Sequence, residues 1–139
     1  MIIKLATLAD YANVTNEGKM NVMGIFSRIR AFEFPTRHQQ CHLIISCETN
    51  DMDRGRTFPY SVKMQDPDGK KLMEMEGVLP VHDINDDHGV HDVNLNLQLN
   101  DLTFHEPGHY QFLISIGDSR DTAVTFVVER IKPPQTRQI

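Results

Sequence analysis

The residues best suited to metal chemistry lie in one acidic segment near the middle of the chain. Asp83, Asn85 and Asp87 are spaced two residues apart, as are the first oxygen ligands of a calcium-binding loop. Such a loop has glycine at its sixth position and a bidentate glutamate at its twelfth, where this chain has His88 and Asn94. The match is partial, and a solvated acidic turn between two strands is the simpler interpretation.

Histidines extend this segment without completing a transition-metal site. The full set of candidate ligands is Asp83, Asn85, Asp87, His88 and His91. The sequence contains no His-x-x-x-His pair on a predicted helix, and no His-x-Asp or His-x-Glu pair that opens a facial triad. We predict that this loop binds no metal ion, and nothing else in the sequence indicates a cofactor.

A second group of polar side chains offers neutral amides. In residues 91–100, valine and leucine alternate with polar residues, as expected for a strand with one buried and one wet face. The polar face carries Asn94, Asn96, Gln98 and Asn100. A face that is solvated or covered by a loop is the simplest interpretation. Because amides pair without charge, the functional hypothesis is an interaction face, buried in a homo-oligomer or against a partner protein, with sugar binding as the alternative.

The remaining polar residues form no catalytic constellation. Gly117-Asp118-Ser119 is similar to a hydrolase nucleophile motif, but such a serine needs a histidine to accept its proton. No histidine follows His109 in the chain, so a turn is the better interpretation of this motif. The eight glycines fall singly at turns rather than together in a phosphate loop. We predict that the protein is not an enzyme.

Composition limits what these residues can do. The chain has 139 residues, a formal net charge of −5 and an isoelectric point near 5.7. This acidity disfavours binding to nucleic acid or to an anionic membrane. Cys41 and Cys47 lie on one predicted strand, too far apart to bridge, so both are expected to be buried thiols. Because no leader or membrane-spanning segment is recognisable, we expect a soluble cytoplasmic protein.

Alternating hydrophobicity predicts the elements that position these groups. Period-two runs are separated by turn residues at intervals of about 8–12 residues, which is typical of sandwiches and barrels. The predicted fold class is all-β, an antiparallel β-sandwich of seven to nine strands. We assign residues 1–132 to this single domain and residues 133–139 to a flexible tail. Residues 5–12 contain good helix formers, and a short helix there is the alternative to a first strand.

One corner refines the type of sandwich. Pro107, Gly108 and Tyr110 precede a strongly alternating strand, as at the tyrosine corner of immunoglobulin-like sandwiches. This arrangement favours an immunoglobulin-like fold. We predict that the Tyr110 ring is buried and that its hydroxyl group bonds to the backbone between Phe104 and Pro107.

Two further expectations concern exposure. Pro59 and Lys63 lie on one predicted strand, and both residue types protect sheet edges from unwanted pairing, so we expect this strand at an edge. His42 alternates with Cys41 and Leu43 and is therefore expected at a partly wet face.

The chain also resembles a family of short bacterial proteins of unknown function. The matching segments are Leu8-Ala9-Asp10-Tyr11-Ala12, Gly18-Lys19, Gly24-Ile25-Phe26, Phe34-Pro35, and Leu102 with Pro107-Gly108-His109-Tyr110. The resemblance spans most of residues 1–130 and implies a compact β-rich fold and an intracellular bacterial setting. It implies no activity. The expected function is a non-enzymatic interaction or accessory module acting through assembly or partner binding, and the alternative is a module that binds a sugar or a divalent metal.

Overall fold

The structure is a computed structural model that describes residues 1–82, 91–118 and 121–133. In these residues the chain forms nine strands, one turn of 3-10 helix (η1, Asp51–Asp53) and no α-helix. The strands are β1 (Ile2–Val14), β2 (Met20–Phe26), β3 (Arg28–Ala31), β4 (Thr36–Thr49), β5 (Thr57–Gln65), β6 (Lys71–Pro80), β7 (His91–Phe104), β8 (Gly108–Ile116) and β9 (Thr122–Arg130).

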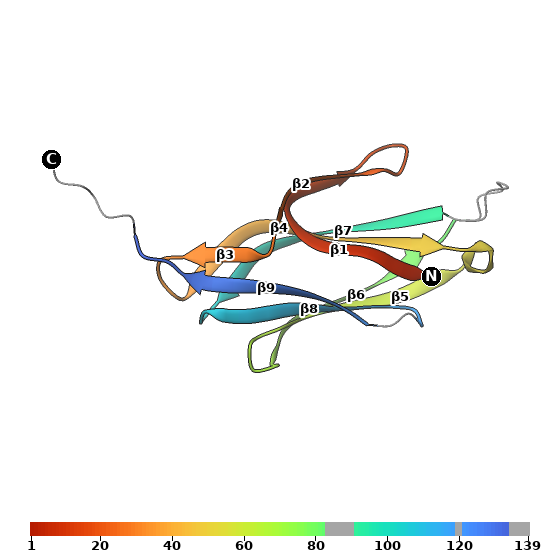
Figure 1. Cartoon of the computed structure of the whole chain (residues 1–139). Coiled ribbons are helices and arrows are strands. Elements are labelled where there is room, and N and C mark those ends of the chain that lie inside the picture. The colour runs from red at the N-terminus through yellow and green to blue at the C-terminus, as the bar shows by residue number, and fades with distance from the viewer. Residues whose placement is uncertain (83–90, 119–120, 134–139) are drawn as a thin grey trace.

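The strands form two sheets that pack face to face (Figure 1). One sheet has the order β2-β1-β4-β7, and the other has the order β3-β9-β8-β5-β6. Neighbouring strands are antiparallel, except that β3 runs parallel to β9. The predicted all-β sandwich is therefore confirmed.

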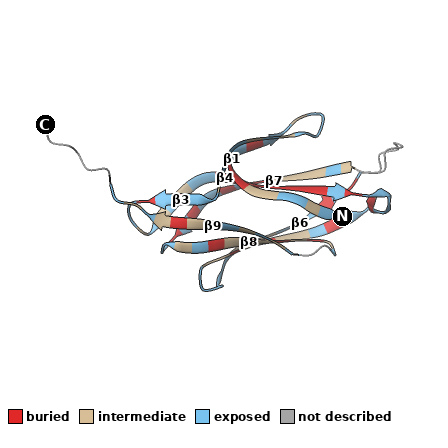
Figure 2. Cartoon of the chain, viewed as in Figure 1, coloured by how far each residue is buried: buried red, intermediate tan, exposed pale blue. Residues whose placement is uncertain are grey.

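The main core fills the space between the two sheets. On β4 the inward side chains are Cys41, Leu43, Ile45 and Cys47, which alternate along the strand and are almost fully buried. In Figure 2 the buried residues appear as red bands on strands of both sheets. In the opposite sheet, the ring of Phe112 on β8 stacks on the Phe126 ring of the neighbouring strand β9, with the ring centroids 5.4 Å apart. The period-two pattern of the sequence thus identifies the inner faces correctly.

The corner between β7 and β8 connects the two sheets. The Tyr110 side chain is 2% exposed, and its hydroxyl group donates a 2.6 Å hydrogen bond to the carbonyl oxygen of Glu106. The Phe104 ring lies edge-on to the tyrosine ring, with centroids 4.9 Å apart. The prediction for Tyr110 is confirmed. This corner is one local feature, and immunoglobulin-like character for the whole fold stays a prediction.

The first strand corrects one expectation. No helix forms at residues 5–12, because this segment lies within β1 and pairs with both β4 and β2. Leu8 and Ala9 are adjacent and both almost fully buried, so two opposite sides of the segment are covered. Helix propensity differs by less than about 0.7 kcal/mol among ordinary residues, and pairing with burial outweighs it.

The expected edge strand is also placed differently. β5 lies inside its sheet between β8 and β6, so Pro59 and Lys63 do not protect an edge. Pro59 is tolerated because the ladder with β8 begins one residue later, at Tyr60. Its missing N–H group therefore costs no bond within that ladder.

The second half of β1 leaves the sheet and forms a third layer. β1 pairs with β4 as far as Ala9, and from there its pairing is with β2. We call residues 10–26 the arm: the end of β1, the turn, and β2. In Figure 1 the arm lies above β4 and β7, over the outer face of their sheet. Ile44, on that outer face, is fully buried as a result.

Candidate interaction surface

The predicted amide face lies on β7, which is an edge strand, and it faces the arm. The Nδ2 group of Asn96 donates a 2.9 Å hydrogen bond to the carbonyl oxygen of Ala12, on β1. The Nδ2 group of Asn94 donates a 2.8 Å hydrogen bond to the carbonyl oxygen of Gly18, in the turn at the tip of the arm. Two of the four amides therefore hold the arm by its backbone.

The oxygens of the same two amides bond to β4. Asn94 Oδ1 accepts a 2.6 Å hydrogen bond from the hydroxyl group of Ser46, and Asn96 Oδ1 lies 2.8 Å from Nδ1 of His42. Since Asn96 Oδ1 can only accept, His42 Nδ1 carries the proton in this contact. Each amide thus connects β7, β4 and the arm, and this network fixes the position of the arm along the sheet.

His42 corrects an expectation from the sequence. Its side chain is 4% exposed rather than partly wet, because the arm covers it. The Tyr11 ring packs edge-on against the imidazole with ring centroids 5.3 Å apart. Within the described residues, Nε2 of His42 has no hydrogen-bond partner. The imidazole is therefore a packed structural group under the arm.

Gln98 and Asn100 are the part of the predicted interaction face that stays open to solvent. Both side chains are exposed, and Gln98 Nε2 donates a 3.1 Å hydrogen bond to Asn100 Oδ1. Their role in contacts with another molecule stays a prediction. The amide face is thus divided between internal docking of the arm and an open polar end.

The arm carries exposed apolar side chains, one of which, Tyr11, also packs on the buried His42 ring. Tyr11 on β1 is the direct partner of Met23 on β2, so the two side chains lie on the same face, and Ile25 follows two residues later. Met23 and Ile25 are each 66% exposed, and Tyr11 is 46% exposed. We call Tyr11, Met23 and Ile25 the arm patch. Large apolar side chains that lie near one another in contact with water are typical of an interaction site.

The patch lies along an unprotected sheet edge. β2 is the outermost strand of its sheet in the described residues, and Met20–Phe26 contains no charged residue, proline or lysine. The other edge strands of the described sheets carry charge: Arg28 and Arg30 on β3, Lys71, Glu74 and Glu76 on β6, and Asp92 and Asp101 on β7. Of these edges, β2 therefore has the least protection by charge against pairing with another strand.

Gly24 shapes this edge. Its φ angle is +70°, a conformation that L side chains rarely adopt. A Cβ atom built at Gly24 would lie 2.5 Å from the carboxylate of Asp10, so the backbone at this point is open only to glycine. Met23 and Ile25 flank this glycine in β2.

The pKa values of Glu129 and of the two cysteines are set by structural contacts and burial. The hydrogen bond from Arg30 to Glu129, at 2.9 Å, holds the pKa of that carboxyl group below its ordinary value. Burial raises the pKa of the Cys41 and Cys47 thiols to about 11, so both are protonated at neutral pH. As predicted, the two cysteines are buried and unbridged. Thiols in this state are poor nucleophiles.

Three carboxylates, those of Asp66, Asp68 and Glu106, offer oxygens within 4.8 Å of one another. Asp66 already has a local role, because its Oδ1 accepts hydrogen bonds from the backbone N–H groups of Asp68 and Lys70. These bonds close the hairpin turn between β5 and β6. The geometry of Asp66 is thus explained by the turn.

Most of the candidate metal loop lies outside the residues that the structure describes. Asp83, Asn85, Asp87 and His88 lie outside the described residues, and His91 is the first residue of β7. Our expectation that this loop binds no metal ion stays a prediction.

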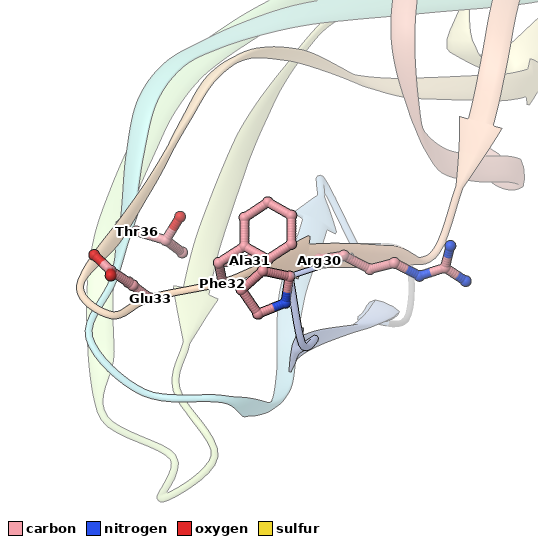
Figure 3. Close-up of a pocket in the computed structure, with 6 residues that line it drawn as sticks. Arg30, Ala31, Phe32, Glu33 and Thr36 are labelled. Atoms are coloured by element: carbon pink, nitrogen blue, oxygen red, sulfur yellow. The ribbon is translucent and has the colours of Figure 1, made fainter. Parts of the chain in front are cut away.

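Two of the surface cavities in the described residues are large enough to hold a small molecule. A cavity of about 490 Å³ is lined by Arg30, Ala31, Phe32, Glu33, Thr36 and Pro133 (Figure 3). Arg30 points away from Phe32 in this view, toward its ion pair with Glu129, so its charge is not directed into the cavity. A second cavity, of about 410 Å³, lies at the tip of the arm and is lined by residues including Val14, Gly18 and Asn94.

The sequence analysis missed the arm patch. Period-two alternation in the β2 segment is weak, because Met20 and Val22 are apolar on one face while Met23 and Ile25 are apolar on the other. The sequence signal that could have revealed the patch is a short strand that is apolar on both faces and carries no charge. Such a strand needs cover on two sides or serves as a contact surface.

Fold and surface together define a β-sandwich domain with an apolar arm across one sheet. The chain belongs to DUF6941, a family of unknown function, whose pattern matches residues 4–129. This confirms the resemblance to a family of unknown function found in the sequence. Comparison with curated proteins gives no match. None of the helices in the described residues is long and apolar enough to cross a membrane.

Proposed function

We propose that the protein is a non-enzymatic interaction module and that the arm patch, with the edge of β2, is its contact surface. The observation that carries this proposal is the exposure of Met23 and Ile25 on a charge-free edge strand. The setting we propose is the bacterial cytoplasm.

The physical reason is that this edge offers two kinds of binding at once. Its outward N–H and C=O groups can add a strand from another molecule, which supplies affinity through the backbone. Covering exposed apolar side chains stabilises a complex by about 25 cal/mol per Å² removed from water. Proteins that leave such an edge unused risk aggregation, and β2 carries no protective charge.

The amide network prepares this surface for binding. Asn94 and Asn96 hold the arm at two backbone positions, so the patch is presented on a docked element rather than on a free hairpin. A surface that is already ordered loses less conformational entropy when a partner binds. In this proposal the amide face acts indirectly, and Gln98 with Asn100 remains available for a second contact.

A pair of lysines tests the contact surface. Met23→Lys together with Ile25→Lys would place two charges in the interface, and Val78→Lys is the matched control. Val78 is equally exposed, at 66%, and lies on the edge strand β6. Molar mass by light scattering and proteins retained from an extract of the source organism are measured for each variant.

We expect the double variant to lose oligomers or retained proteins that the wild type and the control keep. Its far-ultraviolet circular dichroism spectrum should match that of the wild type, because the replaced side chains are exposed. Identical behaviour of all three proteins would refute this contact surface.

Ligand binding is the second candidate, and the cavity at the tip of the arm favours it. Its wall combines the apolar side chain of Val14 with the amide of Asn94, a mixture suited to a sugar. A thermal-shift screen with monosaccharides and disaccharides tests this candidate. No stabilisation at millimolar concentrations would remove it.

A further inference from the structure

We infer that the occupant of the β2 edge is a second copy of the chain, paired antiparallel to β2 about a two-fold axis. This inference rests on the proposed contact surface and names its partner. The pairing would connect the β2-β1-β4-β7 sheets of two copies through their arms.

Symmetry makes the arm patch self-complementary. In a two-fold contact the same surface is used by both copies, so residue i meets residue j and residue j meets residue i. Pairing centred on Gly24 sets Met23 opposite Ile25 of the other copy, twice. Pairing centred on Met23 sets the two Met23 side chains opposite each other. Either arrangement covers the side chains that are most exposed on the arm.

Charge also permits this pairing. In a two-fold antiparallel pair the axis passes through one residue position, so even-numbered residues face even-numbered residues and odd face odd. The nearest charges flanking β2 are Lys19 and Arg28, one odd and one even, so these two are never directly opposed. Met20–Phe26 itself contains no charge.

The same rule disfavours two of the other edges. Self-pairing of β6 about Met75 would set Glu74 directly opposite Glu76, and self-pairing of β3 about Ile29 would set Arg28 opposite Arg30. Like charges directly opposed across a strand pair are destabilising.

Self-pairing about the centre of β7 would oppose no like charges, but it would cover less apolar surface. Its exposed outward side chains, Gln98 and Asn100, are polar and already hydrated, whereas those of β2 are apolar. Covering the β7 edge would therefore remove little apolar surface from water. β2 is the edge that self-association favours.

Cysteine cross-linking tests the pairing and its register. Directly opposed residues in antiparallel strands have Cα atoms about 4.5–5.5 Å apart, within the range that a disulfide spans. Met23→Cys alone reports pairing centred on residue 23. A mixture of Met23→Cys and Ile25→Cys reports pairing centred on Gly24. The native Cys41 and Cys47 are buried and should not interfere, and Val78→Cys on β6 is the control.

We expect a dimeric molar mass in light scattering for the wild type and a monomeric mass for the Met23→Lys, Ile25→Lys variant. Under mild oxidation, a cross-linked dimer should form with one of the β2 cysteine arrangements and not with Val78→Cys. A wild type that is monomeric at high micromolar concentration would overturn the inference, as would a dimer that the two lysines leave intact.

The two proposals fail in different ways. If the wild type is a monomer and the lysine variant loses a partner protein that the control retains, self-pairing is wrong while the contact surface stands. If the lysines change neither the mass nor the retained proteins, both proposals are wrong.

Discussion

The two faces of β4 are both buried, but hydrogen bonds take a larger part on the outer face, which also buries Ile44. On the inner face, Cys41, Leu43 and Ile45 pack against apolar side chains of the opposite sheet. On the outer face, His42 and Ser46 bond to the amides of β7, which in turn bond to the backbone of the arm. One strand therefore supports an apolar core on one face and, on the other, a thin layer of polar contacts between β4, β7 and the arm, which we call the seam.

This difference explains how the arm can be held in one position and still open without unfolding of the rest of the domain. Apolar packing is non-directional and grows with area, so the inner core stabilises the whole domain. Amide hydrogen bonds are directional, and each contributes only about 0.5–1.5 kcal/mol net. The seam should thus set where the arm sits while adding little to global stability, and local opening of the arm should require less free energy than unfolding.

The largest expected effect is in the inner core. Phe112→Ala should lower the free energy of unfolding by about 3–5 kcal/mol, because the ring is fully buried and stacked on Phe126. Urea unfolding followed by circular dichroism measures this loss. A cost below 1 kcal/mol would mean that the two sheets are not packed through this ring.

A substitution in the seam should lower the free energy of unfolding by less than one in the inner core, and it should affect the arm more than the rest of the chain. Asn96→Ala removes the bond to the Ala12 carbonyl and leaves the His42 imidazole unpaired at Nδ1, at an expected cost of about 1–3 kcal/mol. Hydrogen exchange should show faster exchange in the arm, with the β8 and β9 amides still protected.

Gln98→Ala is the matched control, since it removes an exposed amide from the same face of β7. Its stability should remain within about 0.5 kcal/mol of the wild type. Equal effects of the two substitutions, or loss of protection throughout the chain in Asn96→Ala, would contradict a separable arm.

Tyr110→Phe should cost about 0.5–1.5 kcal/mol, the net contribution of one buried hydrogen bond. The ring keeps its packing against Phe104, and the change deletes only the bond to the Glu106 carbonyl. The midpoint of urea unfolding measures it. An unchanged midpoint would show that this corner contributes nothing beyond apolar contact.

The smallest expected effect is on the thiols, which should not react in the folded protein. Burial raises the pKa of Cys41 and Cys47 to about 11, so at pH 8 only about one thiol in a thousand is ionised. Titration with a chromogenic disulfide reagent should find no reactive thiol before unfolding and both thiols in denaturant. Rapid reaction under native conditions would show that this sheet opens readily.

The inner face was predictable because its physics is local in sequence. Alternation along β7 and β8 identifies the buried residues, and the spacing of Pro107, Gly108 and Tyr110 identifies the corner. The four amides were correctly placed on one outward face. Their partners were not predictable, because Ala12 and Gly18 lie some 80 residues earlier in the chain.

The sequence by itself determined the all-β class, the buried faces, the reduced cysteines and the bond of the tyrosine corner. Each depends on side-chain period or on neighbours a few residues apart. Only the tertiary structure decided that β1 turns away from β4 after Ala9, that the arm covers His42, and that Met23 and Ile25 stay in water. Such outcomes depend on which surfaces, distant in sequence, pack against each other. Until that packing is known, an apolar residue is equally compatible with a covered face and with an exposed contact surface.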